Sequence, residues 1–105
     1  MERGRIGEGV DVFYLNLGEA RFLYDEIFET HGYVKHGISL DDRSVVFDVG
    51  ANIGLVGVYL HRRWPGIRLY CFEPIPETFA VLEANVKLHD LQARLFRCAL
   101  GHEPG

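Results

Sequence analysis

The sequence has no apolar run near the roughly 20 residues that a membrane-spanning helix needs. Its opening residues, MERGRIGEGV, lack the apolar core of a signal peptide. Only two cysteines are present, Cys71 and Cys98, far apart and without metal-ligand spacing. Basic residues are not in excess, since 11 Lys and Arg stand against 15 Asp and Glu. These absences favour a cytoplasmic protein with free thiols and give no reason to expect a membrane, metal or nucleic-acid partner.

What is present is typical of one small globular domain. The chain has 105 residues, of which 48% are hydrophobic and 12% aromatic, too many for a disordered chain. Residues 1–11 are polar and glycine-rich, which predicts a frayed lead-in. A short strand is expected at Val12–Leu15 and a helix at Glu19–Thr30, with Gly32 as its stop. Residues 1–40 are therefore predicted to be an extension with one helix.

From residue 41 the pattern alternates between buried strands and amphipathic helices. Strands are expected at Val45–Val49, Ile67–Phe72 and Ala93–Ala99, and helices at Asn52–Arg63 and Pro76–His89. Short links between them predict a parallel sheet with right-handed crossovers, one half of a doubly wound α/β fold. The continuous apolar strands predict helices on both faces of this sheet. Ligands of such folds bind at the carboxyl ends of the strands.

The first of these ends has the sequence VVFDVGANIG. Gly50 permits a tight turn out of the strand, and Gly54 is expected to let the next helix pack closely on it. The G-x-G-x-x-G spacing of dinucleotide sites is missing, and the carboxylate of Asp48 would repel a pyrophosphate. That carboxylate suits the ammonium of S-adenosylmethionine (SAM). A nucleotide-binding oxidoreductase of Rossmann type is the less favoured alternative.

The second strand ends in another acid. Glu73 follows Asp48 by 25 positions and could accept hydrogen bonds from both hydroxyls of a ribose. Such an acid occurs in NAD and SAM sites alike, so it indicates a nucleoside without distinguishing between the two. A solvent-exposed acid at the strand end is the alternative.

Together, FDVGANIG, FEPIPETFAVLEANV and a strand ending in CALG resemble the FkbM family of SAM-dependent methyltransferases. The segment LYDEIFETHGYVKHGISL is similar to members within peptide and polyketide assembly lines. The resemblance implies a Rossmann-like class I methyltransferase fold, with residues 41–105 as its SAM-binding half. It also implies O-methyl transfer to a hydroxyl of a sugar or of a polyketide or peptide natural product, free or carrier-bound. By the resemblance, the methionine end of SAM would contact Asp48, Gly50, Ala51, Asn52 and Gly54, the ribose Glu73 and Pro74, and the adenine Cys98 and Ala99.

No catalytic base can be named from the sequence. His36 could lie over the crevice and Tyr33 could close over the methionine end, but a surface histidine and a packing aromatic are the alternatives. Asn85 also matches the family pattern, and a structural role in its helix explains it equally well.

The family's domain continues beyond its third strand. We therefore expect this chain to be truncated there and inactive by itself. Its first strand would then form an exposed apolar edge, open to self-association. A non-catalytic piece that docks on a partner chain is the corresponding alternative.

Overall fold

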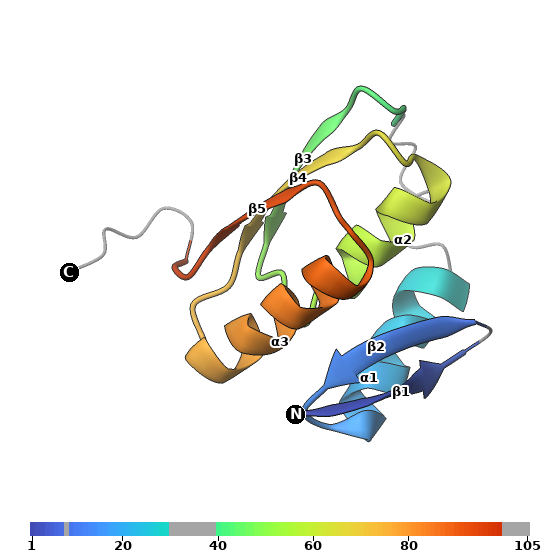
Figure 1. Cartoon of the computed structure of the whole chain (residues 1–105), viewed down its shortest axis with the longest axis vertical. Helices are drawn as coiled ribbons and strands as arrows, with labels where there is room; N and C mark the ends of the chain where they lie inside the picture. The colour runs from blue at the N-terminus through green and yellow to red at the C-terminus, as the bar shows by residue number, and fades with distance from the viewer. Residues whose placement is uncertain (8, 30–39, 100–105) are drawn as a thin grey trace.

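A computed structural model describes residues 1–7, 9–29 and 40–99, which form two small sheets and three α-helices (Figure 1). None of the helices in these ranges is long and apolar enough to span a membrane. The elements in chain order are β1 (Glu2–Ile6), β2 (Val10–Tyr14), α1 (Leu17–Tyr24), the π-helical turn η1 (Asp25–Glu29), β3 (Val45–Val49), α2 (Leu55–Arg63), β4 (Arg68–Phe72), α3 (Pro76–Leu88) and β5 (Ala93–Phe96).

The larger sheet is parallel, with the strand order β3-β4-β5. The predicted βαβαβ unit is thereby confirmed, with β3 at an edge of the described sheet. Helices α2 and α3 lie on the same side of this sheet (Figure 1). The core between them contains Leu55, Leu69 and Leu82, each no more than 2% exposed.

Among the described residues no helix covers the other face of the sheet (Figure 1), which differs from the expectation that helices would cover both faces. On β3, the side chains of Val45, Phe47 and Val49 are 51%, 60% and 57% exposed. Aromatic rings continue this face across β4 and β5, with Phe72 and Phe96 stacked at 4.9 Å. Because side chains alternate along a strand, consecutive apolar residues such as Val45, Val46 and Phe47 present apolar groups to both faces, whether or not both are covered.

The prediction of a frayed lead-in at residues 1–11 is wrong. β1 and β2 form an antiparallel hairpin in which Glu2 lies opposite Tyr14 and Ile6 opposite Val10. Ile6, Val10 and Val12 are fully buried. The segment looked polar because only one face of the hairpin is buried, and Arg3, Arg5 and Asp11 lie on the other.

Helix boundaries depart from the sequence expectation where polar side chains or left-handed residues intervene. α1 begins at Leu17 because the side chain of Asn16 caps it, accepting a hydrogen bond from the N–H of Glu19 at 2.9 Å. α2 begins at Leu55 because Asn52 and Gly54 have left-handed φ angles of 55° and 92°. In the large sheet, β5 ends at Phe96, before the predicted end at Ala99. Thr30 and Gly32 lie outside the described residues.

Substitutions of Gly50 and Gly54 distinguish the cost of a strained backbone conformation from the cost of steric crowding by a new side chain. Both have positive φ, but a Cβ on Gly54 would lie 2.9 Å from Cδ1 of Leu82, whereas one on Gly50 would meet nothing within 4 Å. We expect Gly50→Ala to lower the free energy of unfolding by about 1–2 kcal/mol and Gly54→Ala by about 2–5 kcal/mol. Urea unfolding measures both, and equal losses would contradict the crowding of Gly54 against α3.

Candidate functional site

The turn between β3 and α2 is held to the end of β4 by its own backbone. The N–H groups of Gly50 and Ala51 both donate to the carbonyl oxygen of Phe72, at 2.9 and 3.0 Å. The N–H of Gly54 donates to the carbonyl of Ala51 at 3.0 Å. Gly54 also packs on Leu82 of α3, which corrects the expectation that it would bring α2 close to the strand.

Glu73 joins this turn to the loop that follows β4. Its side chain is buried, and its Oε1 accepts a hydrogen bond from the N–H of Asn52 at 2.8 Å. Its Oε2 accepts another from the N–H of Ile75 at 3.1 Å. Each carboxylate oxygen can accept two hydrogen bonds, so Glu73 keeps acceptor capacity for a ligand hydroxyl. The alternative of a solvent-exposed acid does not fit this burial.

These bonds restrict the ligands that the turn can hold. A pyrophosphate site uses free N–H groups at a helix N-terminus. Here the N–H groups of Gly50, Ala51, Asn52 and Gly54 all donate to acceptors within the protein. These four N–H groups of the turn are therefore not available to a phosphate.

The carboxylate of Asp48 is a buried group that a positively charged ligand would complement. Its carboxylate is only 7% exposed, and its Oδ2 has no hydrogen-bond partner. Burial and then the nearby Glu73 raise the pKa of Asp48 from 3.8 to about 6. Cys71 lies opposite it in the sheet, and burial and then Asp48 raise the pKa of this thiol to about 12. A cationic group placed against Asp48 would stabilise its charged form, so the site fits the ammonium of SAM.

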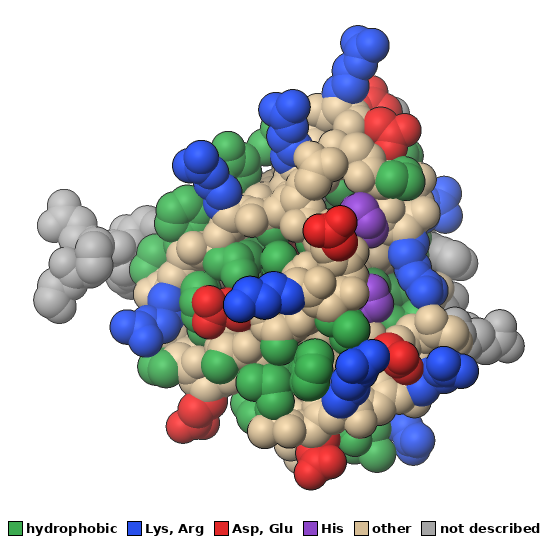
Figure 2. Space-filling model, in the orientation of Figure 1, with side chains coloured by type: hydrophobic (Ala, Val, Ile, Leu, Met, Phe, Trp, Pro, Cys, Tyr) green, Lys and Arg blue, Asp and Glu red, His purple; other side chains and the backbone are tan. Residues whose placement is uncertain are grey.

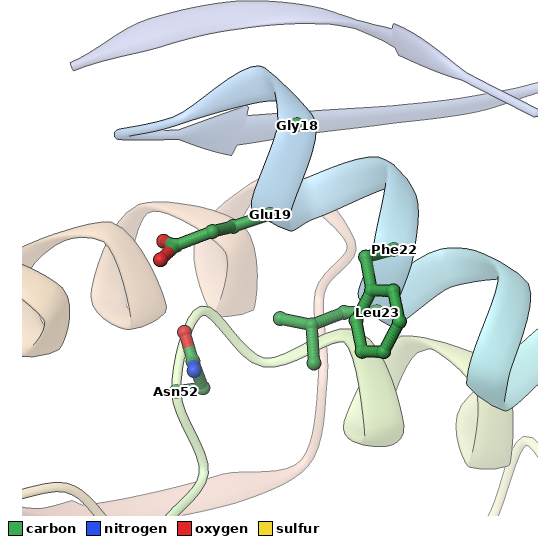
Figure 3. A pocket seen from close by; sticks show the side chains of 5 residues that line it. All are labelled: Gly18, Glu19, Phe22, Leu23 and Asn52. Atoms are coloured by element: carbon green, nitrogen blue, oxygen red, sulfur yellow. The ribbon is translucent and has the colours of Figure 1, made fainter.

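A cavity of about 360 Å³ adjoins the turn on the side of α1. Figure 3 shows the carboxylate of Glu19 and the amide of Asn52 facing each other across it, with Leu23 and Phe22 along the helix wall. Asp48 and Glu73 do not line this cavity, but Asn52 connects the two, because its N–H binds Glu73. No local sequence pattern points to Glu19, since α1 comes next to the turn only through tertiary packing.

The remaining predicted residues lie at the same edge of the large sheet. Pro74 is exposed directly after β4, and Cys98 and Ala99 are half-buried just beyond β5. The N–H of Glu73 donates to the carbonyl oxygen of Phe96 at 3.0 Å, which joins the ends of these two strands. Tyr33 and His36 lie outside the described residues, so their predicted roles have no structural counterpart.

Comparison with curated proteins confirms the resemblance found in the sequence. The chain is 44% identical over its full length to the 31-O-demethyl-FK506 methyltransferase FkbM of Streptomyces tacrolimicus, but it spans only 40% of that protein. It is 42% identical over 82% of its length to the AMB antimetabolite synthetase AmbE of Pseudomonas aeruginosa, covering 4% of it. Methyltransferase sdnD of Sordaria araneosa is 36% identical over 83% of the chain, which covers 34% of that relative. No family model matches.

Solved structures confirm the Rossmann-like fold. A precorrin-6y C5,15-methyltransferase from Geobacter metallireducens aligns with 72% of the chain, with a TM-score of 0.57 and 22% identity, over 40% of its own length. Coclaurine N-methyltransferase, solved with SAH, aligns with 91% of the chain, with a TM-score of 0.61 and 16% identity, over 28% of its own length. At these identities the likeness concerns the fold.

The raised pKa of Asp48 predicts a pH-dependent stability. Because its folded-state pKa of about 6 exceeds the ordinary 3.8, the folded chain holds this proton more tightly than the unfolded chain. Stability should therefore fall as the pH rises from 3.8 to 6, by up to about 3 kcal/mol.

Urea unfolding of the parent chain and of Asp48→Asn between pH 4 and pH 7 measures this fall. The free-energy difference between the two should grow with pH in favour of the variant. Asp90→Asn, at an exposed position after α3, controls for the loss of one carboxylate. Parallel curves of unfolding free energy against pH for the parent and Asp48→Asn would show that the pKa of Asp48 is not raised in the folded chain.

Proposed function

This chain belongs to the FkbM family of methyltransferases, and we propose that it forms the SAM-binding part of an O-methyltransferase. One observation carries the proposal: the buried, unpartnered Oδ2 of Asp48, beside a turn in which the N–H groups of Gly50, Ala51, Asn52 and Gly54 are already engaged. Such a site favours a cation over a phosphate. A Rossmann-type oxidoreductase is correspondingly disfavoured.

In the proposed complex, each strand end contacts one part of SAM. Asp48 receives the ammonium, and the backbone at Gly50, Ala51, Asn52 and Gly54 lies along the methionine end. Glu73 accepts hydrogen bonds from the ribose hydroxyls through its free lone pairs, beside Pro74. The adenine lies near Cys98 and Ala99 after β5. This order is geometrically consistent, because β3 pairs with β4 and β4 pairs with β5, so that the three strand ends are adjacent.

When bound, SAM supplies an electrophilic methyl group on a sulfonium. The protein's part is to align that methyl with an acceptor oxygen, so that the new C–O bond forms as the C–S bond breaks and a base takes the hydroxyl proton. Asp48 contributes by fixing the methionine end, and hence the direction of the S–CH₃ bond. None of the described residues is assigned as that base.

For the acceptor we propose a hydroxyl of a sugar or of a polyketide or peptide natural product, free or carrier-bound. The names of two relatives support this choice, one a 31-O-demethyl-FK506 methyltransferase and one an antimetabolite synthetase.

A cytoplasmic location is proposed with it, supported by the free cysteines Cys71 and Cys98. On the face drawn in Figure 2, basic side chains are spread out with acidic ones among them, which does not favour a nucleic-acid acceptor. Methyl transfer is proposed for the enzyme domain, and cofactor binding for this chain.

Calorimetric titration with S-adenosylhomocysteine (SAH) and, separately, NADH tests the cofactor. We expect SAH alone to bind, and both Asp48→Asn and Glu73→Gln to weaken it at least about 10-fold, since each removes a charge-assisted hydrogen bond. Glu77→Gln, at an exposed acid in the first turn of α3, is the matched control and should bind like the parent.

Two outcomes would contradict the proposal. Binding of NADH alone would favour the oxidoreductase. Absence of SAH binding by a chain that is folded by circular dichroism would remove the cofactor site altogether.

The uncovered face of the large sheet favours a second candidate, self-association of the chain through β3. Light scattering should then show a mass that rises with concentration above the 12.0 kDa of one chain. Phe47→Lys, which places a charge in the middle of this edge strand, should abolish the rise. A mass that stays monomeric at all concentrations is incompatible with this candidate.

A further inference from the structure

Asn85 has no polar surface left for solvent. It lies in α3, its side chain is fully buried, and its amide makes three hydrogen bonds to backbone groups. Oδ1 accepts from the N–H of Phe13 at 2.7 Å, while Nδ2 donates to the carbonyl of Phe13 at 3.0 Å and to that of Ile53 at 2.7 Å. Both amide hydrogens and the oxygen are thus used.

The partners of this amide belong to two different parts of the chain. Phe13 lies in β2 of the N-terminal hairpin, and Ile53 lies in the turn between β3 and α2. They are separated from Asn85 by 72 and 32 positions in sequence. A single side chain of α3 therefore fixes the hairpin and the turn relative to each other.

This link joins the two parts of the chain that lead into the walls of the cavity described above. β2 leads through the cap residue Asn16 into α1, which forms one wall with Glu19, Phe22 and Leu23. The opposite wall is Asn52, the neighbour of Ile53 (Figure 3). Among the described residues, a second polar contact between the hairpin and the end of α3 joins Nε2 of His89 to the carbonyl of Asp11 at 2.6 Å, and it does not reach the turn.

We infer that Asn85 is a positioning residue for the methionine end of the cofactor, because it sets the turn and the α1 wall at a fixed separation. The inference rests on the proposed function. It assigns the N-terminal hairpin and α1 to the cofactor site, rather than to a separate extension. The adenosine end depends less on Asn85, since Glu73 and the ends of β4 and β5 form that side.

Two ligands separate these ends experimentally. SAH carries the amino-acid moiety, whereas 5′-methylthioadenosine keeps the adenosine and lacks that moiety. For Asn85→Leu and Asn85→Asp we expect at least about 10-fold weaker binding of SAH and less than about 3-fold weaker binding of 5′-methylthioadenosine. Leucine preserves the volume of the amide, while aspartate keeps one acceptor and loses both donors.

Ile67→Ala is the control for general loss of stability. Ile67 is fully buried just before β4, at the end of the sheet opposite to the site, so its truncation weakens the core without touching the turn. At a temperature where all variants are folded, it should bind both ligands like the parent. Amide hydrogen exchange without ligand gives a second reading, in which Asn85→Leu should speed the exchange of Phe13 and Gly54 more than Ile67→Ala does.

The outcomes separate the inference from the proposed function. If the parent chain does not bind SAH, the proposed function is wrong and the positioning role is overturned with it. If the parent binds SAH but the Asn85 variants weaken both ligands equally, or neither, Asn85 is only structural. Exchange that speeds at Phe13 but not at Gly54 would equally overturn the link to the turn.

Discussion

The carboxylate of Glu73 is the group on which the carboxyl end of the large sheet depends. It accepts backbone N–H groups from the turn after β3 and from the loop after β4, while its own N–H donates to the end of β5. Three strand ends are therefore held by one buried residue. The arrangement has an electrostatic cost, because burial and then the second carboxylate close by raise the pKa of Asp48. A bound cation would offset that cost, so the geometry of the loops and the proposed preference for a cationic ligand have one origin.

Asn85 does from α3 what Glu73 does within the sheet. Both satisfy backbone groups of the same turn, one at Asn52 and the other at Ile53. The turn has left-handed residues, and these two side chains from elsewhere add to the hydrogen bonds that its own backbone makes. A ligand meeting such a turn finds it already ordered, which reduces the entropy lost on binding.

The sequence predicted those elements whose signals are local. β3 followed from an apolar run, and the start of α3 from Pro76 at its first position. The hairpin was not predicted because half of its residues face solvent. The burial of the other half becomes apparent only when β1 pairs with β2. Three features join residues that are distant in sequence: the hydrogen bonds of Glu73, the contact of Gly54 with Leu82 and the position of Glu19 beside the turn. Periodicity and spacing carry no information about such pairs, whereas the position of Asp48 at a strand end followed directly from them.

The acidity of Cys71 has a practical consequence. With a pKa of about 12, this buried thiol remains protonated at neutral pH, and it is the thiolate that reacts with alkylating reagents. Cys98, half-buried just beyond β5, is then the site where a thiol-directed fluorophore attaches to the folded chain. The native sequence thus offers a single labelling position beside the proposed adenine site, without any engineered cysteine.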